Sequence, residues 1–440
     1  MFKTMKQKIK PWPKKIFSAL LCVSFLAALC GGGSGNQPVA KSVTLTFWDP
    51  FESSENFESL ISAYQQKYQN VKIIYTKKDI TTYQQDLLNA LAAGSGPDIF
   101  AINNAWLPQH VDKLTPAPSD LWTFKEYKDT FVDAAVNDLT KEQKIYAAPL
   151  YVDSLGLYYN KDLLGSAQIS TPPKTWAELS GDVQKIKRAD RTGYFTISGL
   201  AAGTITNVNR AADIVYLYML QKGTQPASAD NSKIDFNKTV VVNGVTTNPG
   251  LEGLKFYTSF ANPADLNYNW NSRSDYSIDA FANGRAAFLY GYSYVAATIR
   301  QKNSNLNFDV APVPQPTLTD PAVNFANYWA EGVSKQSKNP QEAWKFLKYL
   351  TSKESLDKYY AKHKMPSSRK DLISLQIQDP DIGVFASANL TAKTFFKPDQ
   401  EKMDSIFGRM VENVIFNGFS LQEALGQAAK QAETLVQKGN

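Results

Sequence analysis

Acidic, amide and aromatic side chains follow several of the predicted strands of this sequence. Carboxylates and amides hydrogen-bond to polar groups, and aromatic rings stack on flat apolar faces, so the two kinds together are typical of a ligand-binding cleft. The candidate hydrogen-bonding residues are Asp49, Glu52, Asn103, Asn104, Asp153 and Glu331. The candidate stacking residues are Trp48, Trp106, Tyr151, Tyr292, Tyr328 and Trp329, with Trp270 in a polar loop as a further platform.

Trp48 and Asp49 each have a purely structural alternative. Trp48 directly follows a strand, where an indole ring packs into a core as readily as it faces a ligand. Asp49 precedes Pro50, and aspartate before proline is also a common turn former. Both interpretations stay open for these two residues.

Catalytic and metal chemistry have little support in the sequence. The two histidines, His110 and His363, are isolated, so no His-rich metal site and no His-based triad is visible. No Gly-x-x-x-x-Gly-Lys phosphate loop occurs either. We therefore expect no metal and no cofactor. Glycoside hydrolysis stays open as an alternative, because it needs only two carboxylates and the candidate set holds four.

The candidates come together through the elements that carry them. Apolar strand patterns at 43–47, 71–75 and 99–102 alternate with helical periodicity, which gives the order β-α-β-α-β. That order is typical of a largely parallel sheet, in which ligands sit beyond the carboxyl ends of the strands. The loops 48–52 and 103–106 leave two different strands at this same edge. The sequence thus predicts an α/β fold with a binding edge.

Residues 149–160 form one long apolar and aromatic pattern with a carboxylate in its middle. A buried strand disfavours a charge, and Gly156 indicates the close approach of another backbone or of a ligand. In one interpretation this strand passes from one lobe to another, and Asp153 faces the gap between them. In the other, Asp153 is a turn residue between two short strands.

The 440 residues have room for two or three domains, and the net charge of +6 arises at the N-terminus. Six lysines and no acid lie in the first 30 residues, so the rest is neutral and gives no reason to expect a nucleic-acid partner. An apolar run over 16–29 then has the length of a signal-peptide core. It ends at Cys30, which precedes a flexible tether. No cysteine follows, so we expect no intramolecular disulfide.

Seven short stretches, in this order, resemble the extracellular solute-binding proteins of ATP-driven importers, in the sugar-binding group that includes maltodextrin-binding proteins. They are Leu45-Thr46-Phe47-Trp48, Gly96-Pro97-Asp98-Ile99, Tyr158-Tyr159-Asn160-Lys161-Asp162-Leu163, Pro173-Lys174-Thr175-Trp176-Ala177-Glu178-Leu179, Phe281-Ala282-Asn283-Gly284-Arg285-Ala286-Ala287-Phe288, Ala343-Trp344-Lys345-Phe346-Leu347 and Met365-Pro366-Ser367-Ser368-Arg369. The leader resembles a bacterial lipoprotein signal, in which Cys30 is lipidated. Leu29 departs from the small residue usual before such a cysteine, which leaves an uncleaved anchor as the alternative.

The resemblance implies a two-lobed fold like that of periplasmic binding proteins, with hinge strands and a ligand cleft between the lobes. It implies a signal peptide over 1–30 and a tether over 31–41. The first lobe is expected at 42–150 plus 290–352 and the second at 151–289 plus 353–440, with a second crossing near 290–291. A sugar offers hydroxyl groups and a flat C–H face, which suit the carboxylates and rings of the candidate set.

The resemblance also implies a function, which is binding without chemical change. The protein is expected to be a monomeric receptor, not an enzyme, that delivers a mono- or oligosaccharide to the transmembrane subunits of an ABC permease. It would be exported and held by a lipid on Cys30 at the outer face of the cytoplasmic membrane, or lie in the periplasm. The alternatives are a receptor for a non-sugar solute and a glycoside hydrolase.

Overall fold

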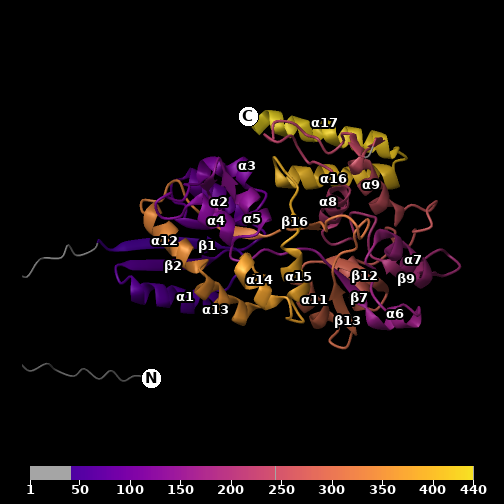
Figure 1. Cartoon of the computed structure of the whole chain (residues 1–440), viewed down its shortest axis with the longest axis horizontal. Coiled ribbons are helices and arrows are strands. Elements are labelled where there is room, and N and C mark those ends of the chain that lie inside the picture. Colours follow the sequence, from indigo (N-terminus) through magenta and orange to yellow (C-terminus); the bar gives the residue numbers. More distant parts are fainter. Residues whose placement is uncertain (1–40, 243, 440) are drawn as a thin grey trace, which may run out of the picture. The chain divides into compact units, whose positions relative to one another are not determined.

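The computed structural model describes residues 41–242 and 244–439, which fold around two five-stranded sheets (Figure 1). The first sheet has the strand order β2-β1-β3-β15-β6. Strand β1 is parallel to β2 and β3, whereas β15 runs antiparallel to β3 and β6. The bounds are β1 (Val43–Asp49), β2 (Val71–Lys77), β3 (Ile99–Asn103), β6 (Ala147–Ala148) and β15 (Trp329–Val333). The predicted β-α-β-α-β unit is therefore present.

The first sheet is stabilised by apolar stripes on the helices that cover it. Phe47 of β1 is fully buried, and its ring lies 5.4 Å from that of Phe57 and 6.4 Å from that of Phe346. These partners belong to α1 (Ser54–Lys67) and α12 (Pro340–Leu350), and α2 (Tyr83–Ala92) and α13 (Lys353–His363) complete the set. Figure 1 shows α12 and α13 beside β1 and β2, although they come late in the chain.

The second sheet has the order β13-β7-β12-β9-β8 and mixed strand directions. Strand β7 is antiparallel to both β12 and β13, and β12 is parallel to β9. The bounds are β7 (Gly156–Asn160), β8 (Arg188–Ala189), β9 (Phe195–Leu200), β12 (Ala286–Gly291) and β13 (Phe308–Ala311). Its helices include α7 (Trp176–Ile186), α8 (Ala211–Gln221), α9 (Pro249–Ser259), α16 (Gln400–Ile415) and α17 (Leu421–Gly439).

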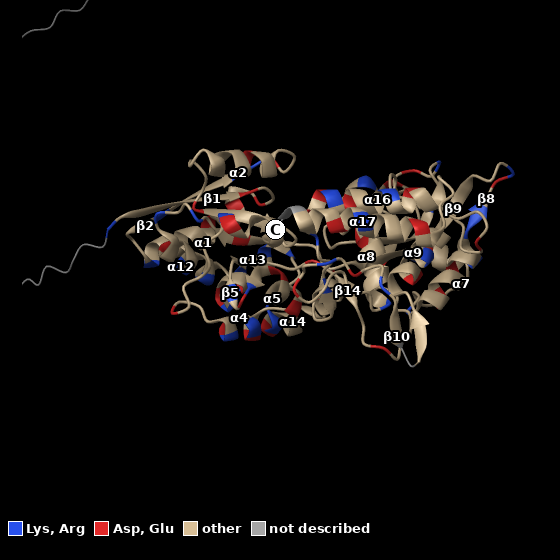
Figure 2. Ribbon diagram, turned by 90° about the horizontal axis from the view of Figure 1, so that it is seen from above, with Lys and Arg blue, Asp and Glu red and all other residues tan. Residues whose placement is uncertain are grey.

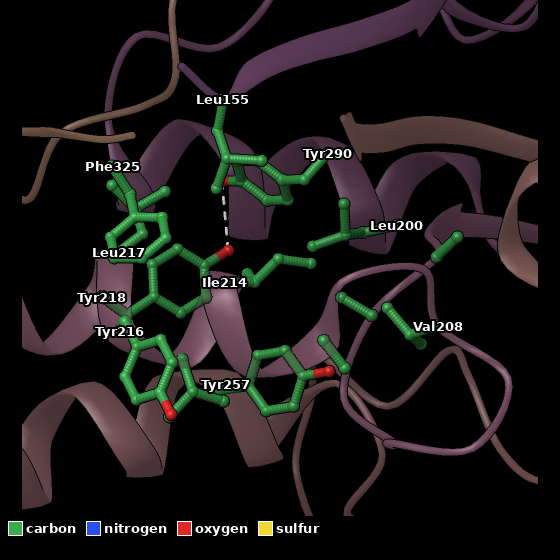
Figure 3. Packing of buried hydrophobic residues seen from close by; sticks show 14 of the residues in the cluster. Leu155, Leu200, Val208, Ile214, Tyr216, Leu217, Tyr218, Tyr257, Tyr290 and Phe325 are labelled. Carbon is green, nitrogen blue, oxygen red and sulfur yellow. Dashed lines mark hydrogen bonds between the residues drawn. The ribbon is translucent and has the colours of Figure 1, made fainter. Parts of the chain in front are cut away.

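Helix α8 lies at the centre of the second hydrophobic cluster. Its residues 213–220 are all buried, as expected for a helix that is apolar on every side. Figure 3 shows Tyr216, Leu217 and Tyr218 packed among Tyr257, Tyr290 and Phe325. The buried hydroxyl groups of Tyr218 and Tyr290 bond to each other at 3.1 Å. This packing supports the loops that precede α8 and follow β12.

Three chain segments connect the two sheets side by side. The first is residues 149–155, between β6 of the first sheet and β7 of the second. The second holds β14 (Asn324–Phe325), and the third holds β16 (Ala392–Lys393), which pairs with β14 in parallel. The Leu155 amide donates to the Phe325 carbonyl at 3.0 Å. The predicted strand over 149–160 is thus regular only in β7, and its first half forms the crossing.

The second crossing lies later than the sequence predicts. Strand β12, which ends at Gly291, and strand β13 both belong to the second sheet, so the chain enters the first sheet only between Ala311 and Trp329. Buried residues of α13 and Leu372 and Ile373 pack in the first cluster. The lobe boundaries stay a prediction, and we propose them with two segments exchanged: 290–311 joins the second lobe, and 353–373 joins the first.

Shorter elements complete the described chain. They are α3 (Leu107–His110), the 3-10 helix η1 (Val111–Lys113), α4 (Phe124–Thr130), α5 (Asp133–Leu139), β4 (Thr140–Lys141), β5 (Lys144–Ile145), α6 (Lys161–Ser166), β10 (Val240–Val242), β11 (Val245–Thr247), α10 (Ser277–Ala282), α11 (Val295–Lys302), α14 (Lys370–Gln376) and α15 (Gly383–Ala388). Within residues 41–242 and 244–439, none of the helices has the length and apolar character needed to cross a membrane. Cys30 lies outside the described residues.

Candidate functional site

Side chains from three distant parts of the sequence meet at one edge of the first sheet. Strands β1 and β3 end there at Asp49 and Asn103, and β15 begins there at Trp329, opposite Asn103. Glu331 lies opposite Ala101, and the β1–β3 register carried one residue further places Asp49 beside the same alanine. The small side chain of Ala101 leaves room for the two carboxyl groups to meet.

Asp49, Glu52 and Glu331 form a cluster that we call the carboxyl cluster. The carboxyl groups of Asp49 and Glu331 lie close enough to influence each other's pKa and to share a proton. Asp49 also accepts the amides of Phe51 at 2.7 Å and Glu52 at 3.0 Å. Burial raises the pKa of Asp49 to about 6 despite these bonds. Burial, and next the charge of Asp49, raises the pKa of Glu331 well above its usual value. Glu331 is therefore the protonated member of the pair.

An aromatic wall stands beside the carboxyl cluster and consists of Phe51, Tyr83, Trp106 and Trp329. The Trp329 ring lies 5.0 Å from that of Phe51 and 4.9 Å from that of Trp106, both in edge-to-face geometry. Phe51 is 39% exposed, so part of the wall faces solvent. The Trp106 indole N–H donates to Gln400 Oε1 of α16 at 2.7 Å, which joins the wall to the second lobe. Trp48 is half-buried, and its ring is covered by the Lys78 ammonium at 4.0 Å.

Asp153 joins the first crossing segment to the loop after β12. Its carboxylate accepts the Ser293 hydroxyl at 2.8 Å and the Ser293 amide at 3.1 Å, 140 residues away. Burial raises the pKa of Asp153 to about 7, and the bonds from Ser293 oppose that rise. These contacts favour the interpretation that Asp153 faces the loops between the sheets. Tyr151, half-buried on the same segment, lies near Asp49, Glu52 and Asp153.

The loop after β12 carries the polar groups of the second lobe. The predicted Tyr292 is buried, and its hydroxyl donates to Asp213 Oδ2 at 2.9 Å. Arg210 Nε donates to the same oxygen at 2.8 Å. The open ring of this loop is Tyr294, which is 50% exposed and stacks on Tyr292 at 6.1 Å. Sequence reasoning missed Tyr294 as a site residue, although its spacing of two from Tyr292 was the available signal.

Tyr292 thus makes an internal contact and is not assigned as a ligand contact, and four other predicted residues also make internal contacts. Trp270 is fully buried in the second cluster, where its indole N–H bonds to Asn207 Oδ1 at 3.3 Å. Tyr328 and Asn104 both donate to Asp138 Oδ2, at 2.9 and 3.0 Å. Asn103 donates to Asn327 Oδ1 at 3.1 Å in the second crossing. We therefore remove Trp270, Tyr328 and Asn104 from the candidate site, because core packing and a buried network occupy them, and assign Asn103 to the hinge.

Comparison with known proteins supports the two-lobe architecture described above. The model of the bacterial extracellular solute-binding protein family matches residues 49–356. The multiple sugar-binding protein of Streptococcus mutans is 24% identical over 79% of this chain and 81% of its own, and the Bacillus subtilis maltodextrin-binding protein is 25% identical over 78% of each. The solved cyclic α-maltosyl-1,6-maltose binding protein of Arthrobacter globiformis superposes with a TM-score of 0.76 at 19% identity, over 90% of this chain and 100% of that one. The two-lobe fold is thus shared, and the chain belongs to the bacterial extracellular solute-binding protein family.

Proposed function

We propose that this protein is the carbohydrate-binding receptor of an ATP-driven importer. The observation that carries the proposal is the juxtaposition of the carboxyl cluster and the aromatic wall at one sheet edge, next to a segment that crosses between the sheets. Carboxylates accept hydroxyl donors, and each such bond contributes about 1.5–3 kcal/mol net. The rings match the apolar face of a sugar. Relatives named for binding multiple sugars and maltodextrin support this ligand class.

The proposed ligand contacts come from both lobes. From the first we assign Trp48, Asp49, Phe51, Glu52, Trp106, Trp329 and Glu331, and from the crossing Tyr151 and Asp153. From the second we assign Tyr294 as the stacking ring, with Arg210 at the margin of the loop. The three crossing segments, bonded side by side, form the hinge about which the lobes would close.

The family consists of binding proteins, and we infer that this one releases its ligand unchanged to permease transmembrane subunits. We further propose that it is an exported monomer, anchored through lipid on Cys30. Figure 2 shows acidic and basic residues interspersed along the ribbons of α4, α14 and α16. Mass spectrometry of the wild-type protein from the membrane fraction should find lipid on Cys30 at a new N-terminus. An unmodified Cys30 behind an intact leader would contradict lipidation and favour an uncleaved anchor.

Tryptophan fluorescence tests the ligand class, because Trp106 and Trp329 lie in the proposed site. Titration with a panel of mono- and oligosaccharides should change the emission saturably for at least one sugar. A response to an amino acid or a peptide, with none to any sugar, would overturn the carbohydrate assignment. Chromatography after incubation with the bound oligosaccharide should recover it intact, and shorter products would support the hydrolase alternative instead.

A further inference from the structure

The carboxyl cluster carries acidity that its surroundings do not balance. Within the described part of the chain, Asp49, Glu52 and Glu331 form no ion pair with lysine or arginine. The groups that face the cluster from neighbouring elements are phenols, namely Tyr75 of β2, Tyr83 of α2, Tyr151 of the crossing and Tyr359 of α13. Burial raises the pKa of each phenol, so all four are neutral at physiological pH.

Lys77 lies opposite Asp49 in the β1–β2 register but is exposed, and two further basic residues near the cluster are otherwise engaged. Lys78, whose amide bonds to the Asp49 carbonyl, sends its ammonium over the Trp48 ring. His363 packs its ring on Tyr359 at 4.8 Å, and burial lowers its pKa, so it is mostly neutral. Neither residue supplies a buried positive charge to the Asp49–Glu331 pair.

One oxygen of the cluster accepts no hydrogen bond from a donor group of the described chain. Glu331 is 3% exposed, and its Oε2 atom accepts no hydrogen bond from any described residue. A buried polar atom without a partner costs about 1–3 kcal/mol. The cost is removed when a donor arrives from outside the chain. Glu331 lies two residues from Trp329, the residue at which β15 begins at the binding edge, so a ligand entering beside Trp329 is the donor considered below.

The surroundings favour an organic cation as this donor. No described group of acidic, histidine or cysteine side chains is arranged to hold a metal ion. Phe51 and Trp329 each stand two residues from a carboxyl of the pair, and their rings pack against each other at 5.0 Å. Aromatic faces and carboxylates together bind ammonium groups, which have three donors and a positive charge. A hydroxyl group has one donor and leaves the charge of the cluster unbalanced.

We propose that the carboxyl cluster binds a protonated primary amino group, so that the carbohydrate carried by this receptor is an amino sugar. This inference rests on the proposed function and sharpens it. The ammonium would donate to Glu331 Oε2 and to the Asp49 or Glu52 carboxylate, while the sugar ring packs on Phe51 and Trp329. The proton shared by Asp49 and Glu331 in the empty site would leave when the cation enters.

Matched sugar pairs test the amine directly. We would titrate tryptophan fluorescence at pH 6.5 with glucosamine against glucose, galactosamine against galactose, mannosamine against mannose, and chitosan dimer against cellobiose. At least one amino sugar should bind ten-fold or more tightly than its neutral counterpart. If a neutral sugar binds and no amino sugar binds more tightly, the inference is overturned and the proposed function stands. Binding of putrescine without any sugar would keep the amine site and overturn the carbohydrate receptor, and no response at all would overturn both.

Replacing one carboxyl group of the cluster by an amide tests the role of its charge in binding while keeping the shape of the side chain. In Glu331→Gln the amide keeps the size of the side chain but not its ability to become an anion, so the affinity ratio of amino to neutral sugar should fall at least ten-fold. Glu52→Gln provides a second variant in case the first fails to fold, as judged by its melting temperature. The matched control is Glu354→Gln on the exposed face of α13, which should leave the ratio as it is. An unchanged ratio in folded Glu331→Gln or Glu52→Gln would refute the proposal.

Discussion

Asp213 of the second lobe and Glu331 of the first are equally buried, at 2% and 3% exposure, yet their surroundings differ. Asp213 accepts hydrogen bonds from Arg210 and Tyr292, and Lys397 Nζ lies 3.9 Å from its other oxygen. Glu331 shares a proton with Asp49 and leaves one oxygen without a partner. The Asp213 network is complete before any ligand arrives, whereas the carboxyl cluster is not.

This difference indicates that the Asp213 network positions a loop, whereas the carboxyl cluster binds the ligand. A buried charge is costly unless it is paired, so the Asp213 network holds the loop 292–294 in one conformation. That loop presents Tyr294 and the Ser293 groups that bond to Asp153. The carboxyl cluster has unused hydrogen-bonding capacity, which a ligand can satisfy. The two regions therefore differ in what a substitution removes, namely folded stability in one and ligand affinity in the other.

The largest effect is expected from Asp213→Ala. It leaves Arg210 and the buried Lys397 with fewer compensating groups, and breaking one partner of a buried ion pair costs about 3–5 kcal/mol of unfolding free energy. Urea unfolding measures this loss. Glu331 pairs with no lysine or arginine, so Glu331→Gln should lower the unfolding free energy by less than about 1 kcal/mol. Equal losses in the two variants would erase the distinction between the regions.

Trp329→Ala should weaken ligand binding by about 2 kcal/mol, or roughly 30-fold, because it removes the central ring of the aromatic wall. Titration calorimetry with the ligand found by fluorescence measures the change. Trp270→Phe is the matched control, since its ring is buried in the second cluster. That variant should lower the melting temperature and keep the affinity. A loss of affinity in Trp270→Phe comparable to that in Trp329→Ala would return Trp270 to the site.

Asp153→Ala should reduce affinity about ten-fold and lower the melting temperature little, because the loss of its bonds to Ser293 is partly offset by the removal of a buried carboxyl group. Asp138→Ala provides the contrast. Asp138 is a half-buried carboxyl group, and Tyr328, Asn104 and Thr394 bond to it away from the proposed ligand contacts. Asp138→Ala should lower the melting temperature and leave the ligand affinity unchanged. The reverse pattern for Asp153 would make it a structural residue.

The smallest effect per step of the measurement is expected in the pH dependence of stability. Between pH 4 and pH 7 the folded protein keeps a proton on Asp153, whose pKa is raised to about 7, while the unfolded chain has released it. Raising the pH through this window therefore favours unfolding through this group, by about 1 kcal/mol per pH unit. In Asp153→Asn the unfolding free energy should fall less steeply with pH, by that amount per pH unit over this window. A steeper fall in the variant would show the sign to be wrong.

Local patterns in the sequence were sufficient for much of the fold. The strand and helix patterns over 43–102 predict the neighbouring strands β2, β1 and β3 of the first sheet, because these strands follow one another in the chain. Thr-x-x-Glu at Thr175 and Ser-x-x-Glu at Ser420 are local helix-start patterns, and the Glu178 and Glu423 amides bond to the respective hydroxyls. For Asp153 the sequence left two interpretations open, and only its bonds to Ser293 favour the crossing between lobes.

The features that the sequence does not predict depend on contacts between residues far apart in the chain. Nothing near Trp270 in sequence shows that its polar loop folds inward, which it does because Asn269 accepts the Leu200 amide at 2.8 Å. The pairing of Arg210 with Asp213 is local, but its role depends on Tyr292, which lies far along the chain. Strand β13 joins the second sheet through antiparallel pairing with β7, and its short sequence does not specify that partner.

A crystal structure with the bound oligosaccharide tests the account most directly. The account predicts an intact sugar between the Trp329 and Asp49 edge of the first sheet and Tyr294 of the second lobe, with a ligand donor within hydrogen-bonding distance of Glu331. Ligand density away from that edge, or a cleaved sugar within it, would contradict the account.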